Sequence, residues 1–176
     1  MKLPKNCLVE KVASQDSTRP AICLPYLDID ADRLTAHIIS TNGAAMVKLP
    51  VEITPEDCAG YVPTAALKEG RKLAKKFDSV DLVCNGSAKL LNGATYPRES
   101  RETFPNWRQV WPKEEGKITL ALDARLLYEL AQALGTEGVV LTFNPGEPIS
   151  VRATSTKGVQ PASFEARGVI MPIRIT

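Results

Sequence analysis

The sequence repeats one order of secondary-structure elements, and this repeat limits the possible folds more than any other feature. Residues 60–112 and residues 117–176 each read as a strand, a helix and three further strands. In the first copy, the last three strands are joined by the turns Asn85-Gly86 and Asn92-Gly93, which are typical of antiparallel hairpins. The sequence therefore predicts an α+β fold of antiparallel sheets with two substantial helices and no parallel doubly wound sheet.

The first helix is predicted over residues 65–77, with Thr64 as its N-cap. Apolar residues recur at spacings of three and four from Leu67 to Phe77, which gives one face for the core. The opposite face carries five cations at the same spacings and is called the basic face below: Lys68, Arg71, Lys72, Lys75 and Lys76. Taken alone, such a run of like charge on a helix favours a solvated surface over a binding site.

The second helix is predicted over residues 124–134. Asp123 precedes it as a cap, and Gly135 ends it as a C-terminal glycine. Its leucines are spaced to face inward. The residues expected on its outer face are not basic as a set, and they are Arg125, Tyr128, Glu129 and Gln132.

Residues 1–57 are predicted to form strands and turns without a long helix. The β-favouring runs are 7–12, 21–29, 34–40 and 44–53, and Thr41-Asn42-Gly43 supplies a hairpin turn. Asp28, Asp30 and Asp32 alternate at the end of the second run. We interpret these three residues as a solvated turn, since no further oxygen ligands follow at a spacing typical of a metal site.

The stretch from Phe104 to Pro112 (Phe-Pro-Asn-Trp-Arg-Gln-Val-Trp-Pro) concentrates aromatic residues in a chain where they make up only 6%. Pro105 and Pro112 lack backbone donors, so the stretch is predicted to be an extended connector that is neither a helix nor an inner strand. Buried aromatic side chains carry much apolar area, which favours a hydrophobic strap pressed against the core.

Composition excludes several classes of protein. With a net charge of +2, any DNA contact has to come from a local cluster of cations. Cys7, Cys23, Cys58 and Cys84 are far apart and His37 is the only histidine, so no zinc site, cofactor or catalytic pair is predicted. No segment has the length and apolarity of a signal peptide or a membrane span. The expectation is a cytoplasmic, non-enzymatic protein with reduced thiols.

Two stretches resemble the bacterial sliding clamp, the DNA polymerase III beta subunit. Phe104 to Pro112 resembles the Phe-Pro-Asp-Tyr-Arg-Arg-Val-Leu-Pro stretch that closes the second domain of that clamp. Residues 169–175 resemble its C-terminal strand, which ends Met-Pro-Met-Arg-Leu. Weaker likenesses are Thr41 to Met46, where clamps have Thr-Asp-Gly-His-Arg-Leu, and Val62-Pro63-Thr64 before the first helix. The resemblance implies a DNA-clamp-like fold.

In clamps, a hydrophobic groove receives peptides of polymerases and repair proteins. The resemblance implies that the groove here would use Thr41, Gly43, Met46, Pro105, Gln109, Val110, Met171, Pro172, Ile173 and Arg174. We expect Met46, Val110, Met171 and Ile173 to converge on one apolar pocket. Ala44 and Ala45 replace a His-Arg pair of the clamps, and Gln109 replaces an arginine, so we expect weaker polar contacts with a bound peptide.

The half-units are predicted at residues 1–57, which lack a long helix, and at 58–116 and 117–176, which are complete. The sequence leaves open which two of them form a domain and whether a ring closes. The leading hypothesis is a shortened clamp-like replication accessory that forms a homo-oligomer. It would bind double-stranded DNA through the basic face, independently of sequence, and would bind a partner peptide in the groove. The alternative is a peptide-binding adaptor or decoy that does not encircle DNA.

Overall fold

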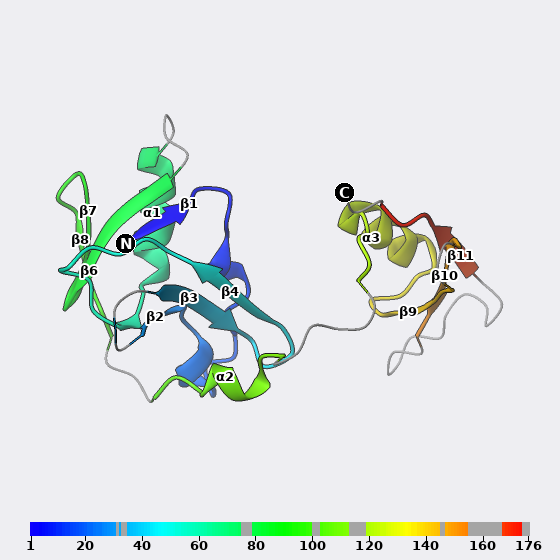
Figure 1. The fold of residues 1–176 in the computed structure, drawn as a ribbon, viewed down its shortest axis with the longest axis horizontal. Coiled ribbons are helices and arrows are strands. Elements are labelled where there is room, and N and C mark those ends of the chain that lie inside the picture. The colour runs from blue at the N-terminus through cyan, green and yellow to red at the C-terminus, as the bar shows by residue number, and fades with distance from the viewer. Residues whose placement is uncertain are drawn as a thin grey trace. The chain divides into compact units, whose positions relative to one another are not determined.

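The computed structural model describes residues 1–30, 32, 35–74, 79–99, 103–112, 119–144, 147–154 and 167–173. The chain divides into two compact units, Met1–Trp111 and Pro112–Thr176, and each is described by itself (Figure 1). Both contain antiparallel sheets and helices, so the predicted α+β class is confirmed. Within the described ranges, no helix has the length and apolarity that crossing a membrane requires.

The first unit contains two four-stranded antiparallel sheets. One has the strand order β4-β3-β2-β5 and the other has the order β1-β6-β7-β8. The strands of the first sheet are β2 (Tyr26–Ile29), β3 (Ala36–Thr41), β4 (Met46–Pro50) and β5 (Gly60–Tyr61). The strands of the second sheet are β1 (Lys2–Pro4), β6 (Ser79–Asn85), β7 (Ser87–Leu90) and β8 (Thr95–Pro97).

Within the first unit, the segments predicted as half-units, residues 1–57 and residues 58 onward, exchange their first strands. β1 comes from the N-terminal half-unit and pairs with β6 of the following one, with Leu3 opposite Val80. β5 opens the second half-unit and pairs with β2 of the first, with Tyr26 opposite Tyr61. Each sheet is therefore completed by a strand from the other half-unit.

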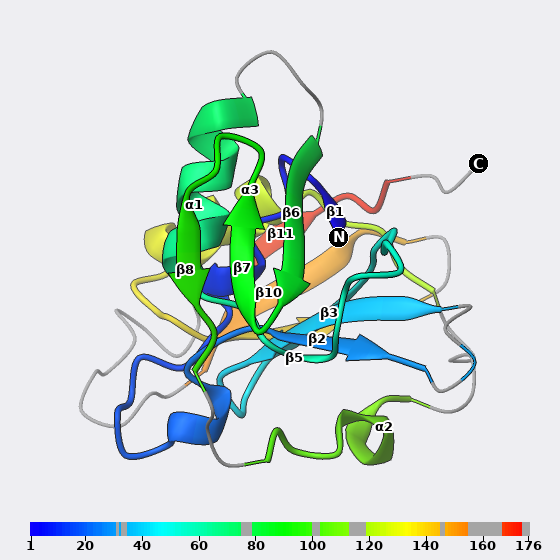
Figure 2. The same ribbon diagram turned by 90° about the vertical axis from the view of Figure 1, so that its left-hand side faces the viewer.

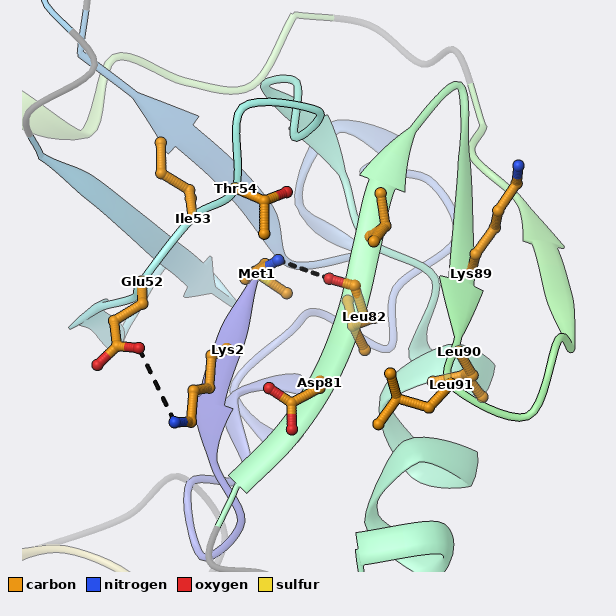
Figure 3. A pocket seen from close by; sticks show the side chains of 11 residues that line it. Met1, Lys2, Glu52, Ile53, Thr54, Asp81, Leu82, Lys89, Leu90 and Leu91 are labelled. Carbon is orange, nitrogen blue, oxygen red and sulfur yellow. Dashed lines mark hydrogen bonds and ion pairs between the residues drawn. The ribbon is translucent and has the colours of Figure 1, made fainter.

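Figure 3 shows the β1–β6 junction from close by. The α-amino group of Met1 donates to Leu82 O at 2.6 Å, and Lys2 pairs with Glu52, just after β4. An open cavity of about 380 Å³ lies beside this junction, with Leu90 and Leu91 of the β7–β8 hairpin in its lining.

Helix α1 (Thr64–Leu73) packs against β6, β7 and β8 in the first unit (Figure 2). Ala66, Leu67 and Gly70 are buried, and the same core contains Leu3, Val9, Leu27 and Ile38 from the N-terminal half-unit. Pro63, not Thr64, occupies the N-cap position, so Thr64 is the first residue of the helix. The predicted helix ran to Phe77, whereas α1 ends at Leu73 and residues 75–78 lie outside the described part.

Two predicted elements of the first unit are wrong. Residues 7–12 are predicted to be β-favouring, but Val9–Lys11 form a 3-10 helix, η1, because burial of Val9 in the core and contacts with β3 hold a turn there. A second 3-10 helix, η2 (Pro20–Ile22), precedes β2. The stretch predicted to be wholly extended contains the one-turn helix α2 (Trp107–Val110), in which Trp111 N donates to Trp107 O at 3.0 Å.

The second unit contains helix α3 (Ala124–Ala133) and a three-stranded sheet of order β11-β10-β9. Its strands are β9 (Val139–Thr142), β10 (Ile149–Ala153) and β11 (Arg167–Ile170). The predicted cap is confirmed, because Asp123 accepts hydrogen bonds from the Arg125 and Leu126 amides. The predicted end is also confirmed, since Gly135 has a φ of +64° and its amide donates to Gln132 O.

Candidate DNA-binding helix and peptide groove

The basic face of α1 is only partly available to a ligand. Lys68 and Lys72 are exposed, and Lys72 Nζ lies 3.2 Å from Glu69 Oε2. The Arg71 guanidinium instead pairs with the Glu10 carboxylate on η1, and its side chain is only 13% exposed. Burial lowers the pKa of Arg71. Lys75 and Lys76 lie outside the described residues, so their part in DNA binding stays a prediction.

An open cavity of about 690 Å³, lined mostly by polar residue types, lies beside the start of α1. Lys68 and Thr64 line it from α1, Glu10 and Lys11 line it from η1, and Ser14 and Ser17 line it from the segment that follows η1. Sequence reasoning did not include Lys11 in the basic face, because a β-favouring run gives no sign of a turn that would bring it to α1. The described residues thus place a third lysine beside the helix.

The turn between β3 and β4 has the predicted hairpin character. Gly43 has a φ of +90°, and Asn42 Oδ1 accepts hydrogen bonds from the Ala44 and Ala45 amides at 2.9 and 2.8 Å. Thr41 is buried, and its Oγ1 donates to Ala45 O at 2.7 Å, so this hydroxyl is engaged by the turn itself.

Arg19 covers the same turn. Its Nη1 donates to Asn42 O at 3.1 Å, and its guanidinium occupies the space that a Cβ on Gly43 would enter. A side chain at position 43 would therefore meet both an unfavourable φ and this guanidinium. Arg19 thus places a cation at this turn, and nothing in the sequence around Arg19 indicates that position.

The aromatic stretch lies against the β2–β3 sheet, as the strap hypothesis expected. Phe104 and Trp107 are buried in a cluster with Ile22, Ile39 and Tyr61. Met46 and Trp111 pack against the edge of this cluster. Two of the predicted groove segments, the one containing Met46 and the one containing α2, therefore meet at one apolar cluster.

The outer side of α2 remains available. Pro105 and Gln109 are exposed, and Val110 is 71% exposed. Lys48 Nζ lies 4.7 Å above the Trp111 ring centroid and 5.1 Å above that of Trp107, at distances typical of cation–π contacts. This surface combines an exposed apolar side chain with aromatic rings, a combination that suits a peptide anchor.

Two residues of the acidic trio fix α2 in place. Asp28 Oδ2 accepts a hydrogen bond from Trp107 Nε1 at 2.8 Å and lies 2.8 Å from Arg108 Nη1. Asp30 Oδ1 lies 2.6 Å from Arg108 Nη2. The sequence predicts that Asp28 and Asp30 are part of a solvated turn, which is wrong, because both bind Arg108 of the aromatic stretch and nothing in the local sequence indicates this distant partner.

The remaining predicted groove residues belong to the second unit. Met171 is 66% exposed and Ile173 is 52% exposed, Pro172 is half-buried, and Arg174 lies outside the described residues. The amide of Ile173 donates to Ala121 O at 2.9 Å. A pocket shared by Met46, Val110, Met171 and Ile173 would join residues of both units, and it stays a prediction.

Comparison with solved structures gives matches to bacterial sliding clamps. The DNA polymerase III subunit beta of Bartonella birtlesii, solved bound to griselimycin, matches with a TM-score of 0.71 and 17% identity, over 100% of this chain and 51% of the clamp chain. The beta subunit of the Streptococcus pyogenes DNA polymerase matches with a TM-score of 0.70 and 13% identity, over 99% of this chain and 50% of the clamp chain. The beta sliding clamp of C. crescentus matches with a TM-score of 0.67 and 21% identity, over 98% of this chain and 50% of the clamp chain. No protein-family model and no curated protein matches the sequence.

The chain spans about half the length of these clamp chains. At such low identity, what is shared is the arrangement of the backbone. The matches confirm the resemblance that the Phe104–Pro112 stretch and the C-terminal strand had indicated. Over nearly its whole length, this chain has the fold of the bacterial DNA polymerase III beta sliding clamp.

Proposed function

We propose that the protein is a clamp-type accessory of DNA replication that acts without catalysis. The observation that carries this proposal is the sliding-clamp fold over nearly the whole chain. The protein would bind double-stranded DNA independently of sequence and would bind a peptide of a polymerase or repair protein in the groove. It would act as a homo-oligomer in the cytoplasm, where its four free thiols would stay reduced.

The DNA-binding part of the proposal rests on α1. Lys68 and Lys72 are exposed on one helix, and Lys11 faces the same cavity as Lys68. Lysines contact backbone phosphates without reading bases, which is what a sequence-independent DNA ligand requires. Arg71, Lys75 and Lys76 complete the proposed set, although the pairing of Arg71 with Glu10 reduces what Arg71 can contribute.

The peptide-binding part rests on the surface around α2. Met46 and Trp111 pack on one apolar cluster, and Val110 stands exposed beside them. Thr41, Gly43, Pro105 and Gln109 would complete this side of the groove. Met171, Pro172, Ile173 and Arg174 of the second unit would supply the other side.

Salt-dependent DNA binding tests the first part. For the double variant Lys68→Ala/Lys72→Ala we expect weaker binding to linear duplex and a log–log salt slope that is smaller by roughly two units, about one per lost phosphate contact. Lys89→Ala is the matched control, because Lys89 is exposed on β7 while its neighbours Ala88 and Leu90 face the core with α1. Equal binding by the double variant and the control would contradict DNA binding through α1.

A labelled clamp-binding peptide of a replicative polymerase tests the second part. We expect Val110→Glu to raise the dissociation constant about tenfold or more, because loss of an anchor in an interface costs at least about 1.4 kcal/mol. Leu91→Glu is the control, since Leu91 is also highly exposed and lies on the β7–β8 hairpin. An unchanged dissociation constant in Val110→Glu would show that the peptide does not bind at this surface.

The adaptor hypothesis remains the second candidate, and the Arg71–Glu10 pair favours it. A helix whose Arg71 is neutralised by the buried Glu10 carboxylate offers fewer cations to DNA than the sequence suggests. Peptide binding that persists in a protein with no salt-dependent DNA affinity would make the adaptor the better description.

A further inference from the structure

His37 lies among the contacts that hold α2 on the β2–β3 sheet. It belongs to β3, where it is paired with Asp28 of β2, and its ring centroid lies 6.1 Å from that of Trp107. Alternate residues of a strand share a face, so His37 lies on the same face of β3 as Ile39, which packs in the cluster of Trp107. The only histidine of the chain is therefore next to the residue that anchors α2.

Two carboxylates beside His37 hold α2. Asp28, its partner across the β2–β3 ladder, accepts the hydrogen bond of Trp107 Nε1 and lies 2.8 Å from Arg108 Nη1. Asp30, just after β2, lies 2.6 Å from Arg108 Nη2. Each polar contact between α2 and the sheet thus uses a carboxylate that a charge on His37 would attract.

Two cations lie on the other side of this arrangement. Lys48 Nζ of β4 is 5.1 Å from the ring centroid of Trp107, and the guanidinium carbon of Arg108 is 4.5 Å from it. With His37 neutral, these two cations balance the two carboxylates. A proton on His37 would place a third cation around one indole ring and leave the group with an excess of one positive charge.

The same four groups act on the protonation of His37. Burial lowers the pKa of His37 most, and the positive charge of Lys48 lowers it further. The two carboxylates raise this pKa and Arg108 lowers it, and the result is a pKa below the ordinary value. Neutral His37 therefore stabilises the fold fully above its unfolded-state pKa of about 6.5, and this contribution is lost as the pH falls through the folded-state pKa.

We propose that His37 is a pH-sensitive switch for the attachment of α2. At neutral pH the uncharged ring packs beside Trp107 and does not compete for the carboxylate of Asp28. When His37 takes up a proton, the imidazolium attracts Asp28 and repels the guanidinium of Arg108 and the ammonium of Lys48. Both effects weaken the contacts that hold α2, so mild acid loosens α2 from the sheet.

Loosening of α2 would also act on the peptide groove. Val110 belongs to α2, whereas Met46 belongs to β4, and the two lie together only while the aromatic stretch packs on the sheet. Weaker peptide binding in mild acid is therefore expected. This consequence rests on the proposed function, but the switch itself does not, because it is measured without any peptide.

Two titrations of the whole chain between pH 7.5 and pH 5.0 test the switch. The imidazole signals in a proton NMR spectrum report His37 alone, and the tryptophan fluorescence reports α2, because both tryptophans, Trp107 and Trp111, lie in the aromatic stretch. We expect the imidazole to titrate with a midpoint below about 6.5 and the tryptophan emission to shift to longer wavelength at the same midpoint, as Trp107 becomes exposed. Emission that stays constant over this range, or that changes at a midpoint unrelated to the imidazole, would overturn the proposal.

Substitutions assign the transition to His37. His37→Gln is neutral at every pH, so its emission should stay constant over this range. Lys48→Met removes a cation near His37 and should raise both midpoints together. Lys89→Met is the matched control, since it removes an exposed lysine from β7 and should change neither midpoint.

Circular dichroism shows whether His37→Gln is folded, and if it is not, the comparison of Lys48→Met with Lys89→Met decides. A transition that persists in folded His37→Gln, or midpoints in Lys48→Met equal to those in Lys89→Met, would overturn the proposal. The labelled clamp-binding peptide should bind more weakly at pH 5.5 than at pH 7.5 in the wild type only. A peptide that does not bind at pH 7.5 would contradict the proposed function, whereas the switch is decided by the two titrations.

Discussion

The indole Nε1 of Trp107 donates a hydrogen bond to Asp28 Oδ2 at 2.8 Å, which ties the aromatic stretch to the β2–β3 sheet. Trp107 is buried, so removing its acceptor would leave an indole N–H unsatisfied. We expect Asp28→Ala to lower the free energy of unfolding by about 2 kcal/mol. Urea unfolding followed by tryptophan fluorescence measures this, because the two tryptophans of the chain, Trp107 and Trp111, are both in this stretch.

Asp28→Asn separates the hydrogen bond from the charge. It keeps an acceptor for Trp107 and loses only the attraction to Arg108, whose side chain is half exposed. Exposed ion pairs contribute about 0–1 kcal/mol, so this variant should lose clearly less stability than Asp28→Ala. Equal losses in the two variants would show that the hydrogen bond to Trp107 is not what holds the stretch.

The sequence predicted those parts of the fold that depend on local pattern. Helices α1 and α3 follow from apolar spacing, and the Asp123 cap and Gly135 end follow from residue type. The turns at Gly43, Gly86 and Gly93 follow from Asn-Gly pairs, and all three glycines have a positive φ. Such signals lie within a few residues of one another and need no knowledge of tertiary contacts.

What the sequence did not predict depends on distant partners. Nothing near Asp28 indicates Trp107, and nothing near Arg71 indicates Glu10. Helical spacing places Arg71 with the DNA-binding cations of the basic face, because spacing reports which side of a helix a residue occupies but not what packs there. The one-turn helix α2 was missed for a related reason: its two flanking prolines indicate an extended chain, while the burial of Trp107 favours the turn.

The Arg71–Glu10 pair leads to a prediction about stability. Arg71→Ala would leave the buried Glu10 carboxylate without its cation, and we expect it to cost about 3 kcal/mol of stability. The double variant Glu10→Ala/Arg71→Ala should lose less than the sum of the two single variants, since neither charge is then left alone. Thermal or urea unfolding of the wild type, the two single variants and the double variant gives the coupling energy between Glu10 and Arg71.

Lys72→Ala is the matched control for Arg71, because it removes a cation from the next position of α1 and Lys72 is exposed. We expect Lys72→Ala to lower the free energy of unfolding by no more than about 0.5 kcal/mol, as for surface substitutions generally. If Arg71→Ala were as mild as Lys72→Ala, the guanidinium would be free to contact DNA and would belong with the other cations of the basic face.

Asp57 gives a prediction about pH. It is buried with the Met1 ammonium, whose nitrogen lies 2.6 Å from Asp57 Oδ2. Burial by itself would raise the pKa of Asp57, but hydrogen bonds from the Met1 ammonium and from the Thr54 and Cys84 amides together outweigh burial and lower it. Because the folded-state pKa is lowered, Asp57 stabilises the fold fully above its unfolded value of about 3.9, and this contribution is lost as the pH falls through the folded-state pKa.

Asp57→Asn isolates this contribution. At pH 7 we expect Asp57→Asn to lower the free energy of unfolding by about 3 kcal/mol. This difference in stability from the wild type should shrink as the pH is lowered below about 4. Unfolding midpoints of both proteins between pH 7 and pH 3 provide the measurement. A difference that stays constant over that range would mean that the ionised carboxylate is not the stabilising group.

Gly70 gives a prediction in which packing opposes helix propensity. Alanine inside a helix is favoured over glycine by about 1 kcal/mol. A Cβ at position 70, however, would lie 2.5 Å from Val80 Cγ1 and 3.1 Å from Leu90 Cδ2, both in the core beneath α1. We expect Gly70→Ala to be destabilised by about 1–3 kcal/mol. Urea unfolding checks this against Glu69→Ala on the same helix, and a more stable Gly70→Ala would show that α1 shifts away from the sheet at little cost.

The exchange of first strands in the first unit has a consequence for the order of folding. The turns of the β6–β7–β8 meander are short, so these strands can close as soon as they are synthesised, whereas β1 must wait for β6. Leu3 and Val80 face each other across the β1–β6 ladder, and closing so long a loop is slow. On the ribosome, β1 emerges well before β6 and is thus among the last strands of the first unit to be paired, so residues 1–57 cannot complete their core until β6 has been made.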